Sequence, residues 1–133
     1  MTTREDLESY LLRMGVEHEE VDENMWLIKP TGGAGVVINY TPPVVLLRLK
    51  VMELPQQKTD DGRLIGFYRR LLELNATDIV HGSYGIEANE VVLSDALELE
   101  DLDFGELRSS YESMVMAASS HTPGLSGLVA HEG

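Results

Sequence analysis

The segment Val44–Glu53 constrains the fold of this chain more than any other stretch of the sequence. Its apolar and polar side chains alternate: one face would carry Leu47, Leu49 and Val51, and the other would carry Arg48, Lys50 and Met52. Successive side chains of a β-strand point to opposite faces of the sheet. A strand with one buried face and one wet face is typical of an antiparallel sheet. The segment therefore predicts an antiparallel sheet that is covered on one side.

Around this strand, changes in hydrophobic periodicity predict three helices and five further strands. The helices are predicted at 3–14, at 61–74 and from 103 onward. The further strands are predicted at 16–21, 25–28, 35–40, 77–84 and 86–93, with a turn at Gly85 in the last pair. The order α-β-β-β-β-α-β-β-α, with short connections, predicts an α+β fold in which an antiparallel sheet packs against helices.

Polar residues and glycine mark the predicted helix ends. Thr3 and Asp6 have the spacing of a capping box, and Gly15 is suited to a left-handed stop. An aspartate precedes the second helix, which we expect to end at Asn75. Asp103 and Glu106 repeat the box-like spacing at the third helix.

The length of 133 residues corresponds to one domain. We predict a single domain over 1–120, with a polar internal linker at 54–62. The segment 121–133 contains Pro123, several glycines and little periodicity, and it predicts a flexible C-terminal tail.

The composition restricts the classes of partner. The net charge of −13 disfavours nucleic acid and anionic membrane surfaces, whereas it favours solubility and basic partners. The absence of cysteine rules out disulfides and thiolate metal sites. The N-terminus is polar and acidic, without an apolar signal segment, so we expect a cytoplasmic protein.

Four features of the stretch 63–119 resemble one family. They are a leucine-rich helix closing on Asn75, the hairpin 79–93 with Gly85, the acidic leucine segment 97–102, and a helix beginning 102–107. Together they resemble the type III secretion chaperone-like superfamily. The closer match is its YbjN-like branch of bacterial sensory transduction regulators, and CesT-like secretion chaperones are more distant. The N-terminal half matches in element order alone.

This resemblance implies a compact, commonly dimeric protein that binds other proteins and carries no catalytic residues. Secretion chaperones of the superfamily hold an extended client segment along apolar grooves and an exposed sheet. We therefore expect a protein client or regulatory partner and a homodimer.

No motif in the sequence predicts catalysis, a cofactor or a metal. The glycine-rich segment 31–35 precedes a strand instead of a helix, so a turn is favoured over a phosphate loop. His18 lies among glutamates on a predicted edge strand. Asp78, His81 and Ser83 share one region without a nucleophile elbow. The acidic segment 95–103 lacks the spacing of a calcium loop.

The sequence suggests two candidate surfaces. The partner-binding surface is predicted in the N-terminal sheet, at Trp26, Leu27, Ile28, Leu47, Leu49 and Val51. The dimer interface is predicted on a helix, with the second helix favoured over the third, at Phe67, Leu71, Met114 and Met116. An alternative function is a sensory domain that responds to a small ligand. An enzyme is the least favoured possibility.

Overall fold

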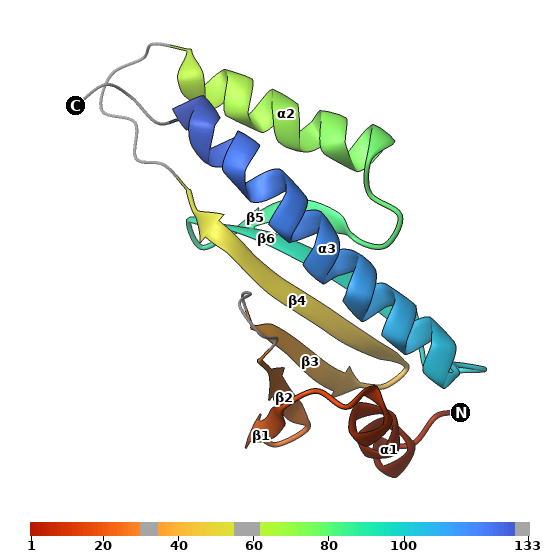
Figure 1. Ribbon diagram of the computed structural model, residues 1–133. Coiled ribbons are helices and arrows are strands. Elements are labelled where there is room, and N and C mark those ends of the chain that lie inside the picture. The colour runs from red at the N-terminus through yellow and green to blue at the C-terminus, as the bar shows by residue number, and fades with distance from the viewer. Residues whose placement is uncertain (30–34, 55–61, 130–133) are drawn as a thin grey trace.

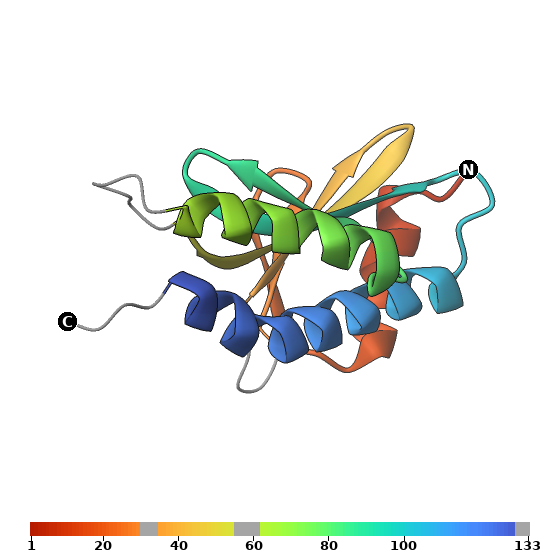
Figure 2. The ribbon, with the colours of Figure 1, turned by 90° about the horizontal axis from the view of Figure 1, so that it is seen from above.

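The computed structural model describes residues 1–29, 35–54 and 62–129. It contains a six-stranded antiparallel sheet with the strand order β1-β2-β3-β4-β6-β5 and helices packed on one face (Figures 1 and 2). The elements are α1 (Arg4–Met14), β1 (His18–Asp22), β2 (Met25–Ile28), β3 (Val36–Thr41), β4 (Val44–Glu53), α2 (Arg63–Thr77), β5 (Ser83–Glu87), β6 (Glu90–Glu98) and α3 (Phe104–Val129). The predicted α+β class and element order are confirmed.

The helix α1 begins and ends as the sequence predicts. The hydroxyl of Thr3 accepts a hydrogen bond from the amide of Asp6, and the carboxylate of Asp6 accepts one from the amide of Thr3. Gly15 ends the helix with a φ of 70°, a conformation that costs glycine little. This helix buries Leu7 and Leu11 against the sheet.

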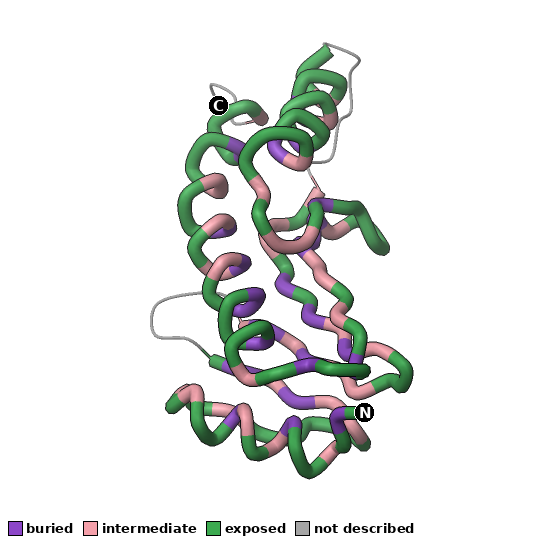
Figure 3. The backbone as a smooth tube through the Cα atoms, turned by 90° about the vertical axis from the view of Figure 1, so that its right-hand side faces the viewer, coloured by how far each residue is buried: buried purple, intermediate pink, exposed green. Residues whose placement is uncertain are grey.

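The register of the sheet aligns buried side chains across five strands. Ile28 pairs with Val36, Val36 with Leu49, and the row continues through Leu93 to Tyr84. All five side chains belong to the core that the helices cover. Figure 3 shows buried positions alternating with more exposed ones along the strands. One continuous core therefore lies between the sheet and the helices.

The hairpin β5–β6 exists, but its predicted turn at Gly85 is wrong. Gly85 lies inside β5 and pairs with Val92. The turn is formed by Ala88 and Asn89, which both have positive φ, as a two-residue hairpin turn requires. The segment predicted to begin β5 at residue 77 belongs partly to α2, and β5 begins only at Ser83.

The helix α2 continues past Asn75 and ends at Thr77. Gly62 occupies its N-cap without a side-chain hydrogen bond, and the predicted start at Asp61 lies outside the described residues. The Asn75 side chain does not stop the helix, because it bonds to the backbone of Tyr84 in β5. A tertiary contact therefore uses the residue that the sequence suggested as a helix end.

The helix α3 extends through residues 121–129, for which the sequence predicted a tail. Its first turn is capped as predicted, with the amide of Glu106 donating to the Asp103 carboxylate. The helix continues across Pro123 because Leu125, which is 1% exposed, packs into the core. Residues 130–133, the linker 55–61 and most of the glycine-rich segment 31–35 lie outside the described residues.

Among the described residues, no helix is both long and apolar enough to span a membrane.

Candidate partner-binding surfaces

Most of the side chains predicted to bind a partner lie in the core. Trp26 is 2% exposed, and Ile28, Leu47 and Leu49 are buried with it. They occupy the inner face of the sheet and belong to the same core as buried side chains of α1 and α3. Val51 is half-buried and also packs against the core. Five of the six predicted residues are therefore unavailable as a surface in this fold.

Leu27 is the exception, because it points to the opposite face of β2. It pairs with Val37 in β3. The neighbouring residues of the same face include further apolar side chains that are half-exposed and lie outside the set packed against the core. We call this set the open sheet face, and its members are Met25, Leu27, Val37, Val44 and Leu46.

Asn39 adds one unusual feature to the open sheet face. It lies between Met25 and Leu46 in the strand register. Its Oδ1 atom is buried and has no hydrogen-bond partner among the described residues. A buried acceptor without a donor costs free energy, so Asn39 is an unfavourable element of this part of the sheet.

The residues predicted for the dimer interface also divide into buried and exposed ones. Phe67, Leu71 and Met114 are buried in the core, whereas Met116 is 70% exposed. The exposed apolar residues of α2 are instead Ile65 and Leu72, each 69% exposed. The sequence includes both in the broad apolar face of this helix, but its periodicity does not separate the covered part from the exposed part.

An apolar groove lies between α2 and the edge strand β5. Its volume is about 260 Å³, and Leu72 of α2 and Ile86 of β5 line opposite sides. Asn75 forms part of the groove, where its side chain accepts from the Tyr84 amide at 2.7 Å and donates to the Tyr84 carbonyl at 3.2 Å. Asn75 therefore covers part of the β5 edge. We call this feature the α2–β5 groove; its lining is Tyr68, Leu71, Leu72, Asn75, Tyr84, Gly85 and Ile86.

The polar residues that the sequence singled out form no reactive arrangement. Asp78 contacts neither His81 nor Ser83 through a hydrogen bond; its partner is His121 Nε2 at 3.2 Å. The Nδ1 atom of His121 lies 2.7 Å from the Tyr84 hydroxyl. Burial, together with the charge of Asp78, raises the pKa of Tyr84 to about 12, so this hydroxyl stays protonated at neutral pH. Through these contacts His121 of α3 connects to Asp78 at the end of α2 and to Tyr84 of β5.

Metal ligation finds no support in the described part of the chain. No group of three or more His, Asp or Glu side chains is placed to hold an ion there. His18 Nδ1 lies 3.0 Å from the carbonyl oxygen of Val16, and the neighbouring carboxylates of Glu19 and Glu20 pair with Lys29 and Arg4.

The fold is that of type III secretion chaperones and of YbjN. The structure is similar to a chain of the heterodimeric ExoU–SpcU complex from the type III secretion system of Pseudomonas aeruginosa. The TM-score is 0.68 at 15% identity, with 86% of this chain and 93% of that chain covered. It is also similar to YbjN, a putative transcription regulator from E. coli, with a TM-score of 0.69, 12% identity, and 92% and 93% covered.

A third similar structure is that of the Yersinia pestis type III secretion chaperone SycH in complex with a stable fragment of YscM2. The TM-score is 0.61 at 17% identity, and the coverage is 89% of this chain and 98% of that chain. The CesT_Tir_1 family model matches residues 1–131, so the chain belongs to the CesT_Tir_1 family. No curated protein sequence matches it. The superfamily predicted from residues 63–119 is confirmed, and the family match extends over the N-terminal half as well.

Proposed function

We propose that this protein is a non-catalytic, chaperone-like binding module that holds an extended or apolar segment of a partner protein. Membership of the CesT_Tir_1 family supports this function. Several chains of similar fold come from complexes between two proteins, including the ExoU–SpcU heterodimer, the secretion chaperone SycH with a fragment of YscM2, and the HopA1–SchA chaperone–effector complex. The proposal transfers the class of activity, not the identity of those partners.

The observation that carries the proposal is the open sheet face. Met25, Leu27, Val37 and Leu46 are apolar and point away from the helices and the core beneath them. Apolar surface of this kind gains free energy when a partner removes it from water, at roughly 25 cal/mol per Å². An extended segment with apolar side chains at alternate positions fits a face whose own side chains repeat with the same period.

The partner surface can be tested with one substitution and a matched control. Leu27→Asp places a charge in the open sheet face, whereas Leu12→Asp places one on the solvent side of α1, where Leu12 is exposed. Proteins captured from native lysate by the wild-type chain should be lost with Leu27→Asp and kept with Leu12→Asp. Capture that is indifferent to Leu27→Asp would contradict the assignment of this face. Far-UV circular dichroism checks that both variants fold.

We further propose that the protein is a homodimer that associates through α2. Ile65 and Leu72 are large and exposed, whereas Phe67 and Leu71 of the same helix are buried. The α2–β5 groove beside them offers an apolar recess for the same residues of a second copy. An isologous contact of this kind closes on itself and forms no higher assembly.

The dimer can be tested by size-exclusion chromatography with light scattering. Leu72→Asp should convert the wild-type dimer to a monomer, because the buried charge would lack a partner. Met116→Asp is the matched control, since Met116 is equally exposed but lies on α3. A wild-type monomer at tens of micromolar contradicts the homodimer. A dimer that only Met116→Asp disrupts places the interface on α3.

A further inference from the structure

The outer face of the sheet changes from apolar to polar between β3 and β5. One row of directly paired residues crosses this face from β2 to β5, and its members are Leu27, Val37, Arg48, Ser94 and Ser83. The first two residues belong to the open sheet face, whereas the other three are polar. The open sheet face therefore borders directly on a polar part of the same sheet surface.

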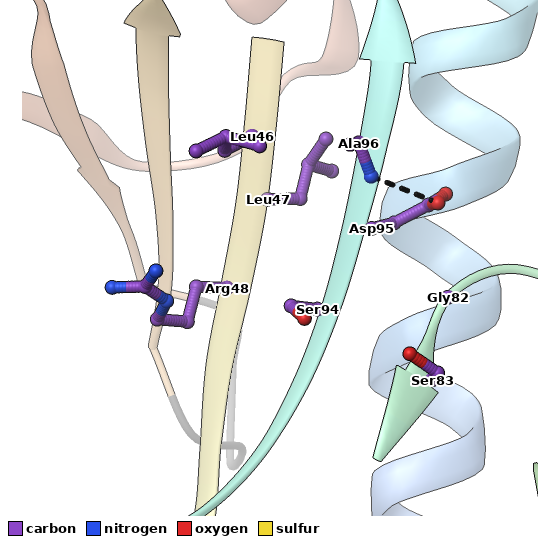
Figure 4. A pocket seen from close by; sticks show the side chains of 8 residues that line it. All are labelled: Leu46, Leu47, Arg48, Gly82, Ser83, Ser94, Asp95 and Ala96. Carbon is purple, nitrogen blue, oxygen red and sulfur yellow. Dashed lines mark hydrogen bonds between the residues drawn. The ribbon is translucent and has the colours of Figure 1, made fainter. Parts of the chain in front are cut away.

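A hollow of about 450 Å³ lies over this polar part (Figure 4). Among the described residues, none from α3 lines it, so the hollow opens on the face of the sheet that the helices leave uncovered. Figure 4 shows Leu46 and Arg48 on the side of β4 away from α3, whereas Asp95 points toward that helix. The hydroxyl of Ser110 in α3 donates to Oδ2 of Asp95 at 2.7 Å. The Asp95 carboxylate is therefore held on the other face and points away from the hollow.

Small side chains form the floor of the hollow. Ala96 of β6 is the direct partner of Leu46 in β4. Ser94 of β6 is the partner of Arg48, so a short side chain lies beside a long one in both pairs. Ser83, the next residue of the row, is short as well. The hollow is the space above these short side chains, beside Leu46 and Arg48.

Arg48 forms one wall of the hollow. Its Nη1 atom lies 3.3 Å from Oε1 of Glu87 in β5. Since β6 lies between β4 and β5, the Arg48 side chain reaches across β6 to make this ion pair. The planar guanidinium is thereby held beside the hollow, and such a group stacks well on the face of an aromatic ring. Because its charge is already paired with Glu87, an anion gains less from it.

Two unused hydroxyl groups lie at the hollow. The hydroxyls of Ser83 and Ser94 form no hydrogen bond with any group of the described residues. A serine hydroxyl donates one hydrogen bond and also accepts. Leu46 and Ala96 add apolar contacts in the same lining. The hollow thus combines a flat cation, apolar side chains and free hydroxyls, which match an aromatic ring that carries a polar group.

We propose that this hollow receives a tyrosine side chain of the partner segment that the protein holds. The ring packs between Leu46 and the guanidinium of Arg48, and the phenol hydroxyl bonds to Ser94 or Ser83. The net charge of −13 disfavours an acidic side chain here, and the nearby guanidinium disfavours a basic one. Tyrosine is neutral at physiological pH and brings both the ring and the hydroxyl.

The open sheet face and the hollow together set a spacing along the partner segment. Ser94 lies two strands from Val37, so the two residues are roughly 10 Å apart at a strand spacing of about 4.8 Å. An extended chain advances about 3.3 Å per residue, and its side chains return to the same face every second residue. Separations of two and four residues reach about 7 and 13 Å, which bracket this distance. The segment should therefore carry tyrosine two or four positions from an apolar residue.

This inference rests on the proposed function, because it names one side chain of the segment that is held. The two can nevertheless fail separately. Lysate capture that depends on Leu27, together with a hollow that ignores tyrosine, overturns only the inference. Capture that is indifferent to Leu27→Asp, together with tyrosine in the hollow, contradicts only the assignment of the open sheet face.

The test uses the full chain labelled with nitrogen-15 and a capped, uncharged peptide of five residues. The peptide has valine at positions one and three, serine at two and four, and tyrosine at position five. It should shift the amide resonances of Ser83, Ser94 and Ala96, and the same peptide with leucine in place of tyrosine should shift them much less. Absence of shifts there, or equal shifts with both peptides, overturns the proposal.

Two other occupants of the hollow are distinguished in the same experiment. Capped tyrosine amide alone should bind more weakly than the peptide, and equal binding would assign the hollow to a free small phenol. The resonances of Ser94 and Ala96 should not move when the chain is diluted without peptide. Movement on dilution would assign the hollow to a second copy of this chain. Either result overturns the proposal.

Ala96→Leu tests the hollow itself, because it puts a longer side chain at an exposed position of the floor. Affinity for the tyrosine peptide should fall about tenfold, as expected when an anchoring side chain loses its pocket. Glu98→Leu is the matched control, since it adds the same side chain two positions further along β6, outside the lining. It should bind as the wild type does. Unchanged affinity in Ala96→Leu overturns the proposal.

Should Ala96→Leu fail to fold, the two serine hydroxyls give a second answer. The wild type should prefer the tyrosine peptide over its phenylalanine counterpart by about fivefold, the usual net contribution of one hydrogen bond. The double variant Ser83→Ala and Ser94→Ala should bind both peptides equally. A wild type without this preference, or a double variant that keeps it, overturns the proposal.

Discussion

The two faces of the sheet are built from the same strands and differ in what covers them. On the inner face, Trp26 and Leu47 lie under the helices and are almost completely buried. On the outer face, Leu27 directly follows Trp26 in the sequence and Leu46 directly precedes Leu47. Both nevertheless face away from the core. Adjacent residues of one hydrophobic run thus have opposite roles. Hydrophobicity alone does not distinguish a core residue from a residue of the open face.

The largest expected effect is the difference in stability loss between a substitution on the inner face and one on the outer face. Trp26→Ala should lower the free energy of unfolding by about 3–5 kcal/mol, because it leaves a large cavity in the core. Leu27→Ala should lower it by less than about 1.5 kcal/mol, because its surroundings are only half-buried. Urea unfolding followed by circular dichroism measures both. Equal losses would mean that the two faces are not distinct.

The sequence predicted a sheet with one buried face, but it also assigned residues of that face to the partner-binding surface. Alternation along Val44–Glu53 correctly grouped Leu47 with Leu49 on one face of the strand. Whether a helix lies over that group depends on contacts distant in sequence, as between Leu7 of α1 and the sheet. The predicted partner surface therefore mixed Trp26 and Ile28 of the inner face with Leu27 of the outer face.

The errors at helix ends and turns have a similar cause. Gly85 was predicted as the hairpin turn because glycine tolerates positive φ, but Ala88 and Asn89 adopt positive φ instead. The register that buries Tyr84 beside Leu93 requires the turn at that point. Likewise Asn75 looked like a helix stop, whereas its side chain bonds to β5. In both cases the tertiary structure outweighs the local preference.

An effect of intermediate size is expected at the β5 edge, which differs from the edge of β6 at Ala96 in what covers it. Asn75 covers the β5 edge at Tyr84, whereas no side chain outside β6 bonds to the amide of Ala96. Asn75→Ala should cost about 1–2 kcal/mol, since it removes two hydrogen bonds at a partly buried site. Hydrogen exchange at the Tyr84 amide should also accelerate.

Thr77→Ala is the control for this comparison, because the Thr77 hydroxyl bonds only to Glu73 within the same helix. It should leave exchange at Tyr84 unchanged. If Asn75→Ala leaves the Tyr84 amide as protected as before, Asn75 does not cover the edge. The newly uncovered β5 should also associate more readily with other strands, which light scattering would detect.

The smallest effect concerns α1, the helix that covers the N-terminal part of the inner face. Hydrogen bonds from the Thr3 backbone amide and from the Thr3 hydroxyl lower the pKa of Asp6 below its ordinary value of 3.8. A carboxyl group whose pKa is lower in the folded state stabilises the fold fully above its unfolded pKa. That contribution is lost as the pH falls below about 3.8 through the lowered pKa.

Wild type and Asp6→Asn should therefore differ in stability at neutral pH. The difference should narrow as the pH falls below about 3.8. Urea unfolding of both proteins at a series of pH values measures it. Glu5→Gln removes a charge from the same first turn without touching the Thr3 cap, so it corrects for the change in net charge. A gap that stays constant down to pH values well below 3.8 would show that the cap does not depend on the charge of Asp6. The cap would then stabilise α1 equally well with a neutral Asp6, in addition to the burial of Leu7 and Leu11.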